Sequence, residues 1–237
     1  MFNHEHHRRT LLTLHQVTAA QAIESKSPVL GYNASKKLAE QAAWQYMKDA
    51  QPSFDLTVIN PDIVTGPMLQ VVSGPNAVNE TNAFAIYGFL NGTYKEIPKF
   101  PYQHFVCLPL SFPDSSIAFM ATDPRKQVDV RDVARAHILS LTSPAASNQR
   151  ILLVSGLILP QLVVNIIRKR FPDLKGRVIE GDPKKIMPEG LNPTGWDTRK
   201  SFEIFGEGWG YKDLETSVVD TVECLLELEG KWKGEGK

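Results

Sequence analysis

Tyr32 and Lys36, in the segment YNASK, are the residues of this sequence best placed to do chemistry. They are four residues apart, so at the start of a helix both side chains project from the same face. A tyrosine with a pKa of about 10 is a weak acid-base catalyst at neutral pH. A nearby ammonium favours the phenolate and lowers that pKa toward the operating pH. The pair is therefore suited to protonating a carbonyl oxygen while hydride reaches the carbon, although a tyrosine beside a solvated lysine would show the same spacing.

The composition excludes several other classes of protein. Hydrophobic residues make up 42% of the 237 residues and charged residues 22%, as in ordinary globular proteins. Lys plus Arg equals Asp plus Glu at 26 each, which argues against nucleic-acid binding by bulk charge. No apolar run approaches the roughly 18 residues of a membrane span. Cys107 and Cys224 lie far apart, so we expect no disulfide scaffold and a cytoplasmic location.

The N-terminal 1–26 are predicted to be a tail, partly disordered. The start, MFNHEHHRRT, is polar and has no signal-peptide core. His4, His6 and His7 lie close enough in sequence to suggest a metal ligand set. Because no acidic or cysteine partners follow, a solvated tail without a metal site is the better interpretation.

A predicted helix is expected to position Tyr32 and Lys36. A helix is predicted over 34–49, because its apolar positions recur at one-turn spacing; they are Ala39, Ala42, Ala43, Tyr46 and Met47. The short β-branched run 56–59 follows and ends at Asn60-Pro61, as a buried strand does. A helix followed directly by a strand favours an α/β fold with a parallel sheet.

Further elements continue this alternation. Strands are predicted at 151–154 and 178–179, and helices at 77–90, after Asp129, from Pro160 to Pro172, and from Asp213 to Gly230. The helix after Asp129 has an apolar face that should pack on the core, with His137 as a core histidine; the face consists of Val130, Val133, Ala134, His137, Ile138 and Leu141. The proline-rich stretch 98–126 shows neither helical nor strand periodicity, and it is predicted to be an irregular insertion.

Four ordered segments then resemble one family. GYNASKKLAEQAAWQYM resembles the catalytic helix of extended short-chain dehydrogenase/reductases, particularly fungal ketoreductases of the methylglyoxal-reductase and dihydroflavonol-reductase type. INPDIVTGP resembles their next strand and loop, VDVRDVARAHILSL a later helix, and LETSVVDTVECLLELEGKW the C-terminal helix. The resemblance covers 27–237 apart from 98–126. It implies the C-terminal part of a doubly wound, Rossmann-like parallel sheet with a small α+β substrate lobe.

The resemblance also implies roles for individual residues. Tyr32 would be the general acid, and Lys36 would bind the nicotinamide ribose and tune Tyr32. Asn60, Pro61 and Ile63 would lie beside the nicotinamide ring, at the carboxyl end of a parallel strand; a simple strand stop would also explain Asn60-Pro61. The implied cofactor is NADP, or NAD, and the implied substrate is a small-molecule carbonyl or alcohol. Asp129 and Arg131 match a family position, but a helix cap and a surface ion pair explain them equally well.

The sequence departs from the family upstream of Tyr32. No G-x-x-G-x-x-G motif precedes it, and no serine or threonine there has the context of the family's catalytic residue. We therefore expect a truncated form that is weakly active or inactive, with an exposed strand edge open to homo-oligomerisation or aggregation. A non-catalytic remnant or interaction protein, and a nucleotide-sugar epimerase or dehydratase, stay open as alternatives.

Overall fold

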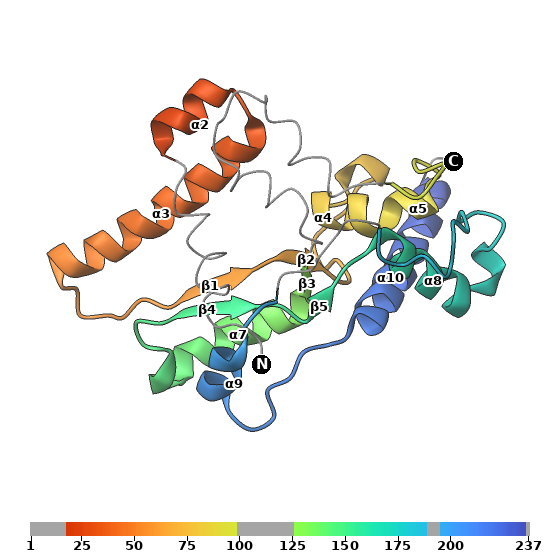
Figure 1. Cartoon of the computed structure of the whole chain (residues 1–237). Coiled ribbons are helices and arrows are strands. Elements are labelled where there is room, and N and C mark those ends of the chain that lie inside the picture. The colour runs from red at the N-terminus through yellow and green to blue at the C-terminus, as the bar shows by residue number, and fades with distance from the viewer. Residues whose placement is uncertain (1–17, 99–125, 189–194, 236–237) are drawn as a thin grey trace.

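The fold is α/β, with short parallel strands between helices (Figure 1). The computed structural model describes residues 18–98, 126–188 and 195–235. Strand β1 (Val58–Pro61) pairs in parallel with β4 (Arg150–Leu153). Strand β2 (Ile63–Thr65) pairs in parallel with β3 (Lys126–Asp129), which pairs antiparallel with β5 (Gly156–Leu157). The predicted parallel pairing is confirmed, but the predicted strand at 178–179 is wrong, since these residues form no strand.

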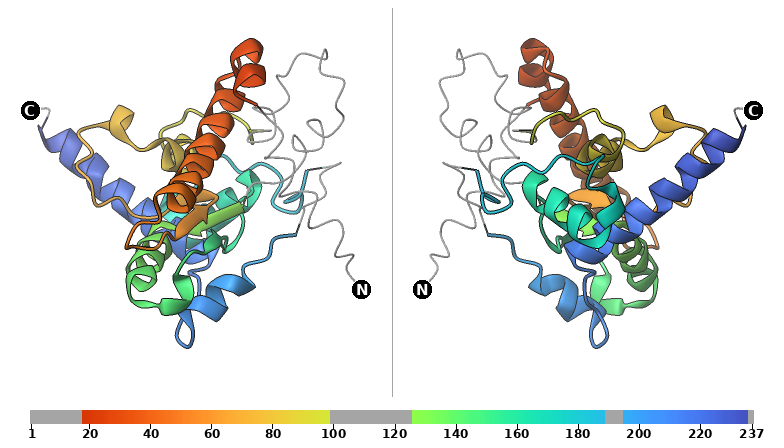
Figure 2. Two further views of the ribbon diagram at one scale, coloured as in Figure 1. Left: turned by 90° about the vertical axis from the view of Figure 1, so that its left-hand side faces the viewer. Right: turned by 90° about the vertical axis from the view of Figure 1, so that its right-hand side faces the viewer.

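Helices flank both sides of the β1–β4 pair. The longer helices of the described chain are α2 (Ala19–Ser25), α3 (Pro28–Ala50), α7 (Val130–Thr142), α8 (Pro160–Arg170), α9 (Arg199–Phe205) and α10 (Leu214–Glu235). The predicted helix at 77–90 is divided into α4 (Glu80–Asn82), the π-helix η2 (Ala83–Tyr87) and α5 (Gly88–Leu90). Helix α3 lies on one side of β1 and β4 and α7 on the other (Figures 1 and 2).

Helix α3 begins earlier than its periodicity predicts. Ser27 caps α3 by accepting a hydrogen bond from the backbone N–H of Leu30, and Pro28 occupies the first turn, as is favourable there. Thr18 and Gln21 form a capping box that starts α2 inside the segment predicted as a tail. Residues 1–17, with the three tail histidines, and 99–125, most of the predicted insertion, lie outside the described residues.

Buried apolar side chains form two clusters. The first joins η2, α8 and α10 into a lobe, around Ile86, Ile167 and Val222. The second lies between β4, α7 and α9, around Leu153 and Ala136. Strand β1 contributes Ile59 to the margin of the second cluster, so this cluster supports the strand that ends at Asn60-Pro61 from the α7 side.

Helix α7 does not bury the face predicted from its apolar pattern. Ile138 is 64% exposed and Leu141 82% exposed, while Asp132 and Ala136 are buried. His137, expected in the core, is exposed, with its Nδ1 2.7 Å from the carbonyl oxygen of Val133. Two side chains explain the reversal: Ala136 is small enough for close packing in the second cluster, and Asp132 accepts the backbone N–H of Lys212 at 2.7 Å.

No helix within residues 18–98, 126–188 and 195–235 is long and apolar enough to cross a membrane.

Candidate active site

Tyr32 and Lys36 share one face of α3, as their spacing predicts. The Lys36 ammonium nitrogen lies over the Tyr32 ring, 5.5 Å from its centroid. At an exposed site such a cation–π contact contributes about 0.5–1 kcal/mol. Tyr32 is 62% exposed and Lys36 is also exposed, so both side chains can reach a bound molecule. The pair is thus a local, solvent-accessible unit that one helix positions by itself.

The rest of α3 is less buried than its pattern indicates. Leu30 and Ala34 are buried in the N-terminal half of the helix, the half that follows directly on α2. The face predicted to be buried is mostly open: Ala39, Ala42 and Tyr46 are exposed, with Tyr46 at 56%. The apolar face of 34–49 is therefore mostly exposed, and α3 contacts the sheet in another way.

That attachment is a polar bridge to the β1–β4 pair. The Arg150 Nε donates to Glu40 Oε1 at 2.7 Å, and Arg150 Nη2 donates to Asn60 Oδ1 at 3.2 Å. The Trp44 indole N–H also donates to Glu40 Oε1, at 3.2 Å. Asn60 is half-buried, and its side-chain oxygen accepts from the same Arg150 that contacts Glu40 on α3. The structure thus brings Asn60 together with the helix that carries Lys36, through two residues that the sequence did not single out.

The other two predicted cofactor-binding residues are placed differently. Pro61 ends β1 and is exposed. Ile63 is buried in the lobe cluster and lines a narrow apolar cavity of ≈ 20 Å³ with Phe84 and Phe89. Ile63 therefore contacts the core of the lobe.

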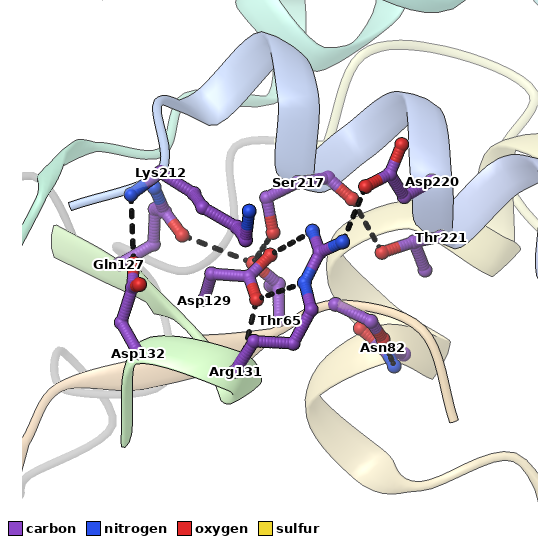
Figure 3. A network of polar contacts seen from close by, with 11 residues as sticks. Thr65, Asn82, Gln127, Asp129, Arg131, Asp132, Lys212, Ser217, Asp220 and Thr221 are labelled. Carbon is purple, nitrogen blue, oxygen red and sulfur yellow. Dashed lines mark hydrogen bonds and ion pairs between the residues drawn. The ribbon is translucent and has the colours of Figure 1, made fainter. Parts of the chain in front are cut away.

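Asp129 and Arg131 belong to a network of polar contacts at the start of α7 (Figure 3). Asp129 is fully buried and caps α7 by accepting the backbone N–H of Arg131 at 2.9 Å. The Arg131 guanidinium donates to both Asp129 oxygens, at 2.7 and 2.8 Å, and to Asp220 on α10 at 2.5 Å. Thr65 and Ser217 extend the network, with their hydroxyl oxygens 3.0 Å apart. The helix cap and the ion pair that the sequence suggested for Asp129 and Arg131 are both present. The ion pair is partly buried and does not lie wholly on the surface.

The electrostatics of this network follow from burial and pairing. Burial opposes the charge of Asp129, but hydrogen bonds from Arg131 outweigh it and hold the pKa of that carboxyl below its usual value. Burial raises the pKa of Asp132, against the hydrogen bond from the Lys212 backbone. Among the described residues no group of three or more His, Cys, Asp or Glu side chains is arranged to hold a metal ion.

Comparison with known proteins gives reductase relatives. No family model matches the sequence. The chain is 33% identical over 206 residues to a ketoreductase of Aspergillus niger, covering 86% of this chain and 53% of that protein. It is 31% identical over 200 residues to a putative NADPH-dependent methylglyoxal reductase of Candida albicans, covering 84% of this chain and 51% of that protein. The chain thus spans about half the length of the curated relatives it matches.

The fold comparison agrees with the sequence comparison. The structure superposes on the crystal structure of Gre2 from Candida albicans with a TM-score of 0.64 and 34% sequence identity, covering 90% of this chain and 56% of that one. The predicted resemblance to ketoreductases and methylglyoxal reductases of the extended short-chain dehydrogenase/reductase type, and the Rossmann-like fold class, are confirmed.

Proposed function

We propose that this chain, a homologue of fungal ketoreductases and methylglyoxal reductases, carries the proton-donating part of an NADPH-dependent carbonyl reductase. The observation that carries the proposal is the exposed Tyr32–Lys36 pair, with the ammonium 5.5 Å from the ring centroid. NADPH is proposed because a relative that is 31% identical is described as NADPH-dependent. The proposed substrate is a small-molecule ketone or aldehyde, or the alcohol in the reverse direction.

The mechanism assigns the proton to Tyr32. A bound reduced nicotinamide would supply the hydride to the carbonyl carbon. The Tyr32 hydroxyl donates its proton to the carbonyl oxygen, which leaves a phenolate on the protein. In this proposal the positive charge of the Lys36 ammonium attracts the negative charge that develops on the Tyr32 oxygen as the proton leaves. An ammonium has three N–H donors, so Lys36 can hold a ribose hydroxyl of the cofactor as well.

The residues present fit only one end of the cofactor. Lys36 is exposed beside Tyr32, and Asn60-Pro61 stand at the carboxyl end of β1, where ligands of open α/β sheets bind. Ile63, expected beside the nicotinamide ring, is buried in the lobe cluster. The Gly-rich turn that binds a pyrophosphate at a helix N-terminus does not occur in the sequence before Tyr32. The proposed contacts are therefore confined to the nicotinamide and its ribose.

The test joins this chain to the dinucleotide-binding half of a relative and follows NADPH oxidation with a panel of aldehydes and ketones. Tyr32→Phe should lower kcat by about 10²–10⁴-fold, the usual contribution of general acid catalysis, with little change in NADPH binding. Lys36→Ala should weaken both turnover and binding. Tyr46→Phe is the matched control, since it removes a similarly exposed hydroxyl (56% against 62% exposed) from the same helix. A Tyr32→Phe protein that keeps most of its rate would assign the proton to another group.

A non-catalytic role of the given chain is the second candidate, since the chain spans only about half the length of the curated relatives described above. Titration of the chain alone with NADPH, followed by cofactor fluorescence, separates the two. No saturable binding at micromolar concentration is expected for the chain alone. The epimerase or dehydratase alternative lacks comparable support, because the relatives with more than 30% identity described above are a ketoreductase and a methylglyoxal reductase.

A further inference from the structure

Helix α3 carries the proposed proton donor, yet it lies outside the apolar core. Within the described residues, neither of the two buried clusters includes a side chain of α2 or α3. In both side views the α2–α3 hairpin rises away from the strands (Figure 2). Among the described residues, the contact between α3 and the β1–β4 pair is therefore sought in polar side chains.

The polar bridge is where α3 meets the sheet. Arg150 faces Val58 in the parallel register of β4 and β1. Side chains of paired residues lie on the same side of a sheet, and those two positions apart on one strand do too. Arg150 and Asn60 therefore share the face that α3 covers, and there Arg150 reaches both Asn60 Oδ1 and Glu40 Oε1.

We infer that Arg150 is a positioning residue that fixes the catalytic helix against the strand end carrying Asn60; this rests on the function proposed above. Glu40 lies eight residues after Tyr32 on the same face of α3, about 12 Å along the axis at 1.5 Å per residue. A tilt of about 10° at Glu40 would move Tyr32 by about 2 Å, by this lever length. A misplacement of about 1 Å can already cost about 10²-fold in rate.

The chemistry of the bridge calls for arginine. A guanidinium presents several N–H donors in a planar fork, so one side chain can hold a carboxylate through Nε and an amide oxygen through Nη2. A lysine at this position would keep a charge near Glu40 but would lose the fixed direction toward Asn60. The side chains of Arg150 and Glu40 are 39% and 20% exposed. Solvent therefore reduces the attraction between their charges without abolishing it.

Hydrogen exchange of the full chain tests this role. Arg150→Met should increase amide exchange in 28–50 about fivefold, the equilibrium equivalent of about 1 kcal/mol. Glu40→Gln should do the same, and the double variant should add little, because both changes remove one bridge. Arg150→Lys should restore part of the protection. Exchange in 130–142, within the α7 core, should stay unchanged and so separates local release from global destabilisation.

The matched control is Arg199→Met, which removes an exposed arginine paired with Asp197 at a different place on the surface. Unchanged exchange in 28–50 for Arg150→Met, or an equal increase for Arg199→Met, would overturn the inference. These outcomes do not depend on the proposed function. If Tyr32→Phe keeps its reductase rate, the proposed role of Arg150 is unaffected. If Arg150→Met leaves exchange unchanged, Tyr32 can still be the proton donor.

Discussion

Asp129→Asn offers the sharpest test of how the two clusters are joined. The buried Asp129 carboxylate accepts the backbone N–H of Arg131 and two guanidinium hydrogen bonds. It thereby closes the start of α7 and, through Arg131, reaches Asp220 on α10. Asparagine has almost the same shape but no charge, and its amide nitrogen faces a guanidinium donor. The substitution therefore removes the ion pair without opening a cavity.

The expected loss of stability follows from burial. Breaking a buried ion pair costs about 3–5 kcal/mol when the remaining charge has no partner. Here the remaining Arg131 is 35% exposed and keeps Asp220 at 2.5 Å, which reduces the cost. Asparagine also remains a good helix cap. We expect Asp129→Asn to lower the free energy of unfolding by about 2–3 kcal/mol, a large share of the usual 5–15 kcal/mol.

Denaturant titration at two pH values is the assay. The pKa of Asp129 is lowered in the folded protein, so its stabilisation is complete above its unfolded pKa of about 3.9 and is lost as the pH falls through the lower folded value. The difference between wild type and Asp129→Asn should therefore be full at pH 7 and should shrink toward pH 3. Asp220→Asn, whose carboxylate is 32% exposed, should cost less than about 1 kcal/mol. A loss below 1 kcal/mol at pH 7, or a difference that is unchanged at pH 3, would refute the reasoning.

Two further substitutions test the surroundings of the site. Gly66 has a φ of +130°, and a Cβ there would lie 2.8 Å from Val130 Cγ1; Gly66→Ala should destabilise the protein by more than about 1 kcal/mol in thermal or denaturant unfolding. Leu141→Glu, at a side chain 82% exposed on α7, should change the unfolding free energy by no more than about 0.5 kcal/mol and reduce any concentration-dependent self-association in size-exclusion chromatography. A cooperative loss of stability in Leu141→Glu would mean that this face is buried in the folded chain.

Elements with strong local signals were predictable from the sequence. Helix α8 begins at Pro160, and its last turn precedes Pro172, because proline favours the first turn and disrupts a helix interior. The start of α7 at Asp129 was likewise predicted from its cap. The orientation of α7 was not, because periodicity reports which face is apolar but not which face a neighbour covers. The polar residue Asp132 instead faces inward, since the Lys212 backbone supplies a hydrogen bond for it.

The two parts of the proposed site also differ in how far the sequence predicts them. Tyr32 and Lys36 are four residues apart on one helix, so their contact depends only on helix geometry and was visible in the sequence. Glu40 and Arg150 are 110 residues apart, and their contact depends on the parallel register of β1 and β4. No local pattern distinguishes either residue from a solvated charge. That Arg150 lies opposite Val58, on the face toward α3, can be recognised only after the pairing of the strands is known.

The proposed catalytic pair should respond differently to changes within α3 and to changes at the Arg150 bridge. The Tyr32–Lys36 contact needs only an intact α3, so it persists in any chain that forms this helix. Its usefulness depends on where α3 stands relative to β1, and we propose that the half-exposed Arg150–Glu40 pair helps to set that position. Half-exposed ion pairs are weak and weaken further with salt. A substitution such as Arg150→Met can therefore leave the chemical group intact and still remove its alignment with Asn60.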